Sequence, residues 1–210
     1  MLQKISLILL AAGCSERMGD RDKLLLLYNG KSILQHAVDL LSALSVMSDG
    51  ICSASFDMTL GVEKIIVTTL ERSKNIHIPE DVKLIFNNKP EMGQSESIKL
   101  GLKFAAGSSY MFMVADQPKL TIDDIKPLLS AVQGNTDKII YPIVKGKPAT
   151  PVIFPALFKT VLLSLTGDKG GREIRNNNPK SCIEINVENP DNFIDIDTMK
   201  EYNRFLGIRN

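Results

Sequence analysis

The sequence is poor in the residues that mark several specialised classes of protein. Its 210 residues include no tryptophan, two histidines and three cysteines. Cys14, Cys52 and Cys182 are odd in number, widely separated and without metal-ligand spacing. This usage argues against a disulfide framework and a cysteine-based metal site, and it favours a reducing compartment such as the cytoplasm.

No charge of one sign dominates. The chain has 25 basic and 24 acidic residues, a formal net charge of +1. A nucleic-acid or membrane partner would normally be marked by a large field of one sign, so neither is expected, and any anion site must be local. With 44% hydrophobic residues the chain can bury one substantial core, and we expect a single domain over residues 1–210.

Long hydrophobic runs are also missing. The apolar stretch at residues 5–12 is far shorter than the roughly 20 residues of a membrane helix. Lys4 followed by ISLILLAAGC also resembles a short signal peptide that ends in a lipid-modified Cys14. A buried strand is the favoured interpretation. The alternative predicts a mature chain that lacks its first thirteen residues, which an intact-mass measurement would detect.

Short apolar runs alternate with stretches of helical periodicity. The unbroken run at residues 5–10 is typical of a fully buried parallel strand. Further strands are expected at 64–68, 83–86, 110–115, 138–142 and 192–196, and helices at 32–46, at 95–106 and from Thr198. Residues 49–61 show no clear period. The alternation predicts an α/β fold with a parallel sheet.

The loop at residues 11–19 follows the first expected strand. Ligands of open α/β sheets bind beyond the carboxyl ends of the strands. Ala12 and Gly13 let the backbone approach a ligand, and successive N–H groups can form an anion-binding nest. Arg17 and Lys23 add two cations. The combination suits a triphosphate, although the loop has neither the P-loop ending nor GxGxxG. The same residues could form a tight turn with two solvated basic side chains.

The motif LAAGCSERMG, followed by Lys23, resembles the signature of MobA-like nucleotidyltransferases, in particular the molybdenum cofactor cytidylyltransferases. The similarity continues through KLLLLYNGKSILQHAVD. It implies a three-layer, Rossmann-like, mostly parallel sheet of the nucleotide-diphospho-sugar transferase type. The nucleotide-binding residues that it implies in this loop are Ala11, Ala12, Gly13, Ser15, Arg17 and Lys23.

The segment GQSESIKLGL at residues 93–102 is similar to the family segment that lies beside the base and ribose. The resemblance implies nucleotide contacts from Ser95 and Ser97. Independently of the family, a serine after a glycine at the start of a helix is a good N-cap. Both interpretations can hold together.

Two further segments carry the carboxylates of the implied metal site. In YMFMVADQPKL a buried strand ends at Asp116, where a carboxylate is costly unless it is paired or bound to a metal. The resemblance implies that Asp116 binds Mg²⁺; a helix N-cap is the alternative, for which Thr121 is better placed. FIDIDTMKEY is similar to a family ending whose aspartate completes the site. Asp195 is the first choice and Asp197 the second, because strand alternation puts both on one face.

The segment LTGDKGGR at residues 165–172 resembles a family loop that faces the acceptor substrate. The resemblance implies that Lys169, Gly170 and Arg172 meet an anionic pterin. An ordinary glycine-rich turn is the alternative interpretation.

The implied reaction transfers CMP from CTP to the phosphate of a (molybdo)pterin and releases pyrophosphate. The attacking phosphate has a second pKa of about 6, so it needs no general base at neutral pH. Catalysis then requires positioning and charge neutralisation, which we assign to Arg17, Lys23 and an Mg²⁺ ion held by Asp116. A molybdoenzyme that receives the product is a further implied partner.

Two other functions compete with this one. The first is another transferase on the same scaffold, acting with a guanine nucleotide, a sugar phosphate or an isoprenoid precursor. Related guanylyltransferases tend to carry two glycines where this chain has Ala12 and Gly13, and the extra methyl group favours the smaller pyrimidine. The second is a non-catalytic nucleotide sensor or molybdenum cofactor accessory protein. The retained carboxylates and Lys23 argue against it.

Overall fold

The computed structural model describes residues 4–14, 18, 21–44 and 61–208. Nearly all of the irregular segment at 49–61 therefore lies outside the described residues. The strands are β1 Lys4–Ala11, β2 Leu27–Tyr28, β3 Lys31–Ser32, β4 Gly61–Thr68, β5 Val82–Phe86, β6 Ser109–Val114, β7 Ile139–Val144, β8 Lys147–Pro148, β9 Val152–Pro155 and β10 Cys182–Asn186. The helices are α1 Ile33–Ala43, α2 Leu70–Ser73, α3 Gln94–Phe104, α4 Ile122–Val132, α5 Lys159–Leu163, α6 Arg172–Asn177 and α7 Met199–Phe205.

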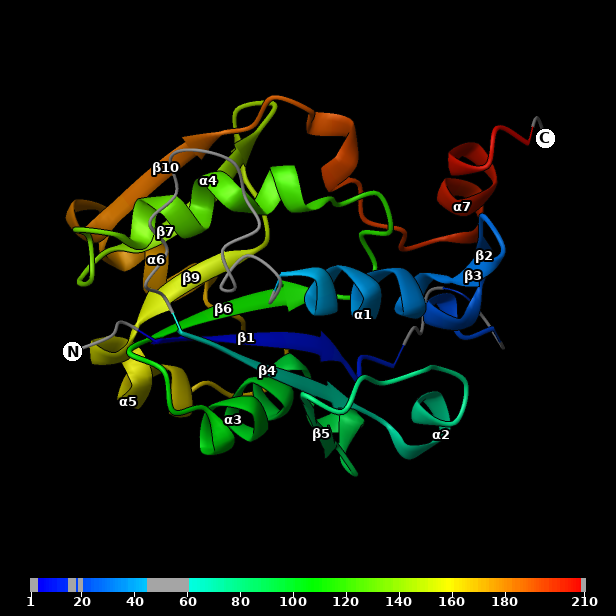
Figure 1. Ribbon diagram of the computed structural model, residues 1–210, viewed down its shortest axis with the longest axis horizontal. Coiled ribbons are helices and arrows are strands. Elements are labelled where there is room, and N and C mark those ends of the chain that lie inside the picture. The colour runs from blue at the N-terminus through cyan, green and yellow to red at the C-terminus, as the bar shows by residue number, and fades with distance from the viewer. Residues whose placement is uncertain (1–3, 15–17, 19–20, 45–60, 209–210) are drawn as a thin grey trace.

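An eight-stranded sheet runs through the molecule (Figure 1), in the order β10-β7-β9-β6-β1-β4-β5, with β8 paired to β7. Strand β1 lies between β6 and β4 and is parallel to both. Strand β9 is antiparallel to its neighbours β6 and β7. The predicted mostly parallel α/β sheet is therefore confirmed, and the apolar run near the N-terminus is one of its central strands.

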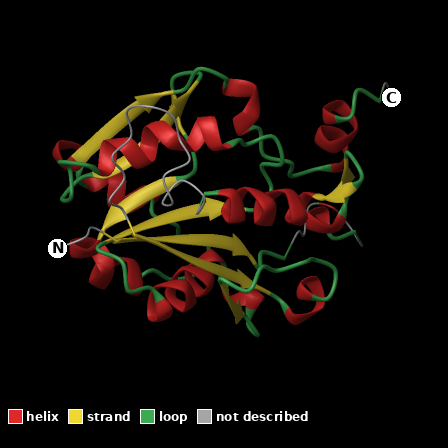
Figure 2. Cartoon of the chain, in the orientation of Figure 1, coloured by secondary structure: helices red, strands yellow, loops and turns green. Residues whose placement is uncertain are grey.

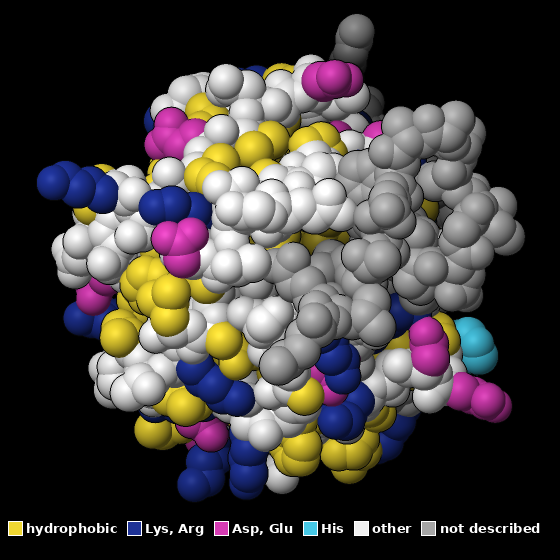
Figure 3. Space-filling view, turned by 60° about the vertical axis from the view of Figure 1, so that its left-hand side comes forward, with side chains coloured by type: hydrophobic (Ala, Val, Ile, Leu, Met, Phe, Trp, Pro, Cys, Tyr) yellow, Lys and Arg dark blue, Asp and Glu magenta, His cyan; other side chains and the backbone are white. Residues whose placement is uncertain are grey.

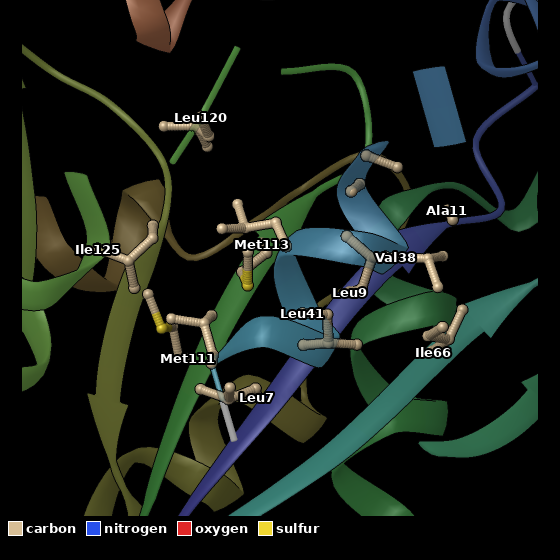
Figure 4. Close-up of a cluster of buried hydrophobic side chains, with 14 of the residues drawn as sticks. Leu7, Leu9, Ala11, Val38, Leu41, Ile66, Met111, Met113, Leu120 and Ile125 are labelled. Carbon is tan, nitrogen blue, oxygen red and sulfur yellow. The ribbon is translucent and has the colours of Figure 1, made fainter. Parts of the chain in front are cut away.

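Helices cover both faces of this sheet (Figure 2). Successive side chains of a strand point to opposite faces. Leu7 and Leu9 of β1 accordingly pack in a core with α1 and α4, whereas Ile8 packs in a second core with α3 and α5. Figure 4 shows the first core, where Leu41 of α1 lies over β1 and β6. The helix, sheet and helix layers match the predicted three-layer arrangement.

The C-terminal part departs from the prediction in one element. The strand expected at 192–196 is wrong: Pro190–Phe193 is a 3₁₀ turn, and an irregular segment leads from it to Thr198. Proline has no N–H for a strand ladder, and it suits the first position of a helical turn. The predicted helix after Thr198 is confirmed, because the Thr198 hydroxyl accepts a hydrogen bond from the Glu201 N–H (3.2 Å).

The described surface carries both signs of charge. Basic and acidic side chains occur among apolar ones on the face shown in Figure 3, as the nearly balanced totals predict. Within the described residues, no helix has the length and apolar character needed to cross a membrane.

The packing of Leu41 gives a test of the fold. Leu41 is fully buried, so Leu41→Ala should lower the free energy of unfolding by about 2–5 kcal/mol through lost burial and a residual cavity. The matched change Leu157→Ala, at a side chain that is 62% exposed, should stay within about 0.5 kcal/mol. Urea unfolding of both variants measures the difference, and equal losses would contradict the described packing.

Candidate active site

The site lies where three parallel strands end. Strands β1, β4 and β6 run in one direction, so their carboxyl ends meet at the same edge of the sheet. Asp116 follows β6 by two residues, and Gly13 follows β1 by two. Ligands of α/β sheets bind at this edge.

Lys23 joins separate segments at this edge. Its ammonium donates hydrogen bonds to Asp116 Oδ2 (2.6 Å) and to Asp197 Oδ1 (2.8 Å). Burial alone would lower the pKa of Lys23, but the charges and hydrogen bonds of the two aspartates together raise it above its usual value. Lys23 is therefore a fixed cation, and it connects the loop after β1 to the end of β6 and to the C-terminal segment.

Asp116 has one oxygen to spare. Its Oδ1 atom is buried and has no hydrogen-bond partner among the described residues, whereas Oδ2 is held by Lys23. Its backbone carbonyl accepts a hydrogen bond from the Ile196 N–H (3.1 Å), which brings residues 195–197 to the end of β6. A buried carboxylate oxygen without a donor is costly, and a hard cation would satisfy it.

Asp195 lies beside these carboxylates. Neighbouring protein atoms limit the hydration of its carboxyl group although the residue as a whole reaches solvent, and this burial, with the negative charge of Asp116, raises the pKa of Asp195 to about 6. Asp197 contributes in the same direction. In the described part of the chain no group of three acidic, histidine or cysteine side chains could hold a metal unaided. A cation here would need further oxygens from a bound phosphate.

A cavity of about 340 Å³ opens above Lys23 and Asp116. Its walls include Ala12, Gly13 and Ser97, three of the predicted nucleotide-binding residues. Ala11 is buried beneath it at the end of β1. Ser15 and Arg17, which were also predicted to bind nucleotide, lie outside the described residues.

The two serines of α3 are buried rather than capping. Gly93 is the N-cap of α3, so the N-cap interpretation of Ser95 or Ser97 is wrong. The Ser97 hydroxyl accepts a hydrogen bond from Asn87 Nδ2 (3.0 Å), and the Ser95 N–H donates to the Gly167 carbonyl (3.0 Å). Asp116 is not an N-cap either, because Thr121 caps α4 with Asp124.

A second cavity, of about 690 Å³, adjoins the first. Leu10, Gln94, Val114 and Asp168 line both cavities. The predicted acceptor residues Lys169, Gly170 and Arg172 all line the second one. Asp195 also lines it, whereas Asp116 and Asp197 line the first. The candidate metal residues thus lie where the two cavities meet.

Two arginines at this edge were missed in the sequence. Arg175 lines the second cavity, and its guanidinium lies 4.8 Å from the centre of the Tyr141 ring. Arg72, in α2, is buried against the loop that follows β1. Each stands in a short polar stretch that reads as solvated surface, so composition and periodicity gave no signal for either.

The sequence model of the MobA-like NTP transferase domain matches residues 7–182. A curated relative, the probable molybdenum cofactor guanylyltransferase of Rhodopirellula baltica, is 26% identical over 138 residues. The match covers 63% of the chain and 58% of the relative, so the chain spans little more than half of that relative's length.

Solved structures share the fold over the whole chain. Rv0371c from Mycobacterium tuberculosis H37Rv has a TM-score of 0.74 and 20% identity, and the match covers 99% of this chain and 100% of that one. A manganese complex of Rv0371C from the same organism has a TM-score of 0.70 and 19% identity, with 98% of both chains covered. At these identities the likeness concerns the fold alone.

The contact between Gly93 and Gly167 gives a test of the site geometry. Gly93 has φ +85°, and a Cβ atom there would lie 2.5 Å from the Gly167 carbonyl oxygen. Gly93→Ala should therefore destabilise the protein by more than the about 1–2 kcal/mol of left-handed strain alone, because the 167–168 backbone must also move.

Gly134→Ala is the matched control, since Gly134 has φ +77° and open space around it. Thermal or urea unfolding compares the two variants. An equal loss of stability in both would mean that the close contact between these two backbones does not exist.

Proposed function

We propose that this chain, which belongs to the MobA-like NTP transferase domain family, transfers CMP from CTP to the phosphate of a molybdopterin-type acceptor and releases pyrophosphate. The observation that carries the proposal is the position of Lys23 and Asp116 at the junction of two adjoining cavities. One cavity is lined by the small-residue loop and the other by basic side chains. This is the arrangement that an in-line transfer between two anionic substrates needs.

The first cavity suits the nucleotide. Ala12, Gly13 and Cys14 bring backbone to its wall, where peptide N–H groups can meet phosphate oxygens. Lys23 supplies a positive charge that its two aspartates keep ionised at any physiological pH. We assign nucleotide contacts to Ser97, and to Ser95 through the position it gives the start of α3. Ser15 and Arg17 are proposed to complete the phosphate contacts.

A divalent cation, proposed to be Mg²⁺, fits the carboxylates. The partnerless Oδ1 of Asp116 is one expected ligand. The pKa of Asp195 is raised partly by repulsion from Asp116, and a cation would remove that repulsion. Asp195 is therefore the first choice for the second ligand and Asp197, which shares Lys23 with Asp116, the second choice. When bound, the cation would neutralise phosphate charge; the manganese complex of the structural relative supports this chemistry.

The second cavity suits the anionic acceptor. Lys169 and Arg172 line it, and Lys169 is paired with Glu173 (3.2 Å), which leaves a net positive contribution from this wall once Arg175 is included. The acceptor phosphate attacks as an anion, so the residues need only hold it in line with the α-phosphorus. None of the described residues is required as a general base.

A guanylyltransferase is the second candidate function. The Rhodopirellula baltica relative carries that name, which favours GTP as the donor. Ala12 in the wall of the first cavity favours CTP instead, because its methyl group takes space from the larger purine.

A nucleotide panel tests the proposal. CTP, GTP, ATP and UTP are each incubated with Mg²⁺ and molybdopterin, and pyrophosphate release is followed together with binding. We expect turnover with CTP in preference to the others. Turnover with GTP alone would establish the second candidate, and tight binding without any turnover would indicate an accessory protein and overturn the proposed reaction.

Asp116→Asn tests the catalytic assignment. The amide keeps the shape of the side chain but loses the negative charge that a cation requires, so kcat should fall by about a hundredfold or more. The matched control is Asp123→Asn, at an exposed aspartate paired only with Lys126 in the printed ion pairs. Steady-state kinetics and thermal unfolding are measured for both. A normal kcat in folded Asp116→Asn would remove Asp116 from the reaction.

Ala12→Gly tests the choice of base. Loss of one methyl group should raise the ratio of GTP to CTP turnover by about tenfold. Ala149→Gly removes the same methyl group from the wall of the second cavity, and it should leave this ratio unchanged. If the two variants show the same ratio as the unmodified chain, Ala12 does not select the base.

A further inference from the structure

Arg72 is a buried cation with no place in the reaction proposed above. It belongs to the four-residue helix α2, directly after β4, and only 5% of its surface is exposed. A charged group in such a position is costly unless several partners compensate it. Its partners therefore indicate why the fold buries it.

Those partners all belong to the loop that follows β1. Arg72 Nη1 donates a hydrogen bond to the Ala11 carbonyl (2.7 Å), and Nη2 donates to the Gly13 carbonyl (2.8 Å). Asp22 receives two more, from Nε to Oδ2 (2.6 Å) and from Nη2 to Oδ1 (3.0 Å). This two-point pairing is specific to the planar guanidinium, which lysine cannot reproduce.

The bonds to Ala11 and Gly13 fix the direction of two peptide groups. In a trans peptide the C=O and N–H bonds point in opposite directions. Because Arg72 holds the carbonyls of Ala11 and Gly13, the N–H groups of Ala12 and Cys14 are turned away from Arg72. Both residues line the first cavity. Arg72 therefore sets, from behind the loop, how its peptide donors are presented.

Asp22 extends the same control to Lys23. Its Oδ1 atom accepts a hydrogen bond from the Leu24 N–H (3.0 Å), which caps the short turn that carries Lys23. The side chain of Asp22 thus bonds both Arg72 and this turn. One arginine fixes the two parts of the nucleotide cavity, the peptide donors and the cation.

We propose that Arg72, acting through Asp22 and the loop carbonyls, is a positioning residue that sets nucleotide affinity. This inference rests on the proposed function. Arg72 orders the loop before the nucleotide arrives, so its loss lowers the fraction of molecules with a competent loop. The acceptor cavity is lined by other residues, and its affinity for the acceptor does not depend on Arg72.

The test uses Arg72→Gln, Arg72→Lys and Asp22→Asn in the full chain. The control is Lys31→Gln, which breaks the exposed ion pair of Lys31 with Asp39. The Kd for CTP and for GTP is measured by calorimetry, and kcat, the KM for the acceptor and thermal unfolding are measured alongside. Asp22 is partly exposed (29%), so its variant keeps the test decisive if the Arg72 variants do not fold.

We expect the nucleotide Kd to rise about tenfold in all three variants, as the competent fraction of the loop falls to roughly one tenth, with the acceptor KM nearly unchanged. Unchanged nucleotide affinity in a folded variant would overturn the inference. So would a proportional loss of affinity for both substrates, which indicates a general structural role. If the unmodified chain neither binds nor turns over any nucleotide, the proposed function itself fails, and the inference with it.

Discussion

The bridge from Lys23 to Asp116 and Asp197 is the interaction on which the site depends. It joins residues separated by 93 and 174 positions in the sequence, and it closes the gap between the loop after β1 and the C-terminal segment. Because three charged groups meet in a partly buried place, each compensates the burial of the others. The ammonium is kept charged, and one carboxylate oxygen is left for a further positive ligand.

The rest of the architecture holds this bridge in place. The parallel strands β1 and β6 bring Gly13 and Asp116 to one edge, and the cores on both faces of the sheet fix the strands. The bond from the Ile196 N–H to the Asp116 carbonyl ties the C-terminal segment to the same edge. The second cavity is joined to the first by the close backbone contact of Gly93 and Gly167. The two substrates can therefore be held next to each other without a large movement of the fold.

The sequence predicted the elements whose own residues carry the signal. The apolar run of β1 and the one-sided apolar pattern of α1 predicted a central strand and its covering helix. Residues 192–196 were misassigned because the alternation of Ile194 and Ile196 imitates a strand, while Pro190 and the bond from Ile196 to Asp116 determine the actual path. Strand β9 was missed because it is short and flanked by prolines, and only its neighbours in the sheet define it.

The same distinction applies to the site. Lys23, Asp116 and the acceptor loop were found because motifs mark them, and the structure brings them to two adjoining cavities; their roles stay predictions. Arg72 carries no motif, and its burial depends entirely on contacts with residues that are 50 to 61 positions away. Such a partner can be found only once the loop and α2 are placed together. A pattern in one stretch of sequence does not contain that information.

The proposed chemistry is tested most directly by following the phosphorus atoms of the donor. The chain is incubated with molybdopterin, Mg²⁺ and CTP labelled with ³²P at either the α or the γ position, and the pterin product and the released phosphate are separated. The proposed attack at the α-phosphorus predicts α label in the pterin product and γ label in pyrophosphate. Label from the γ position in the pterin product, or no labelled product with any nucleotide, would contradict it.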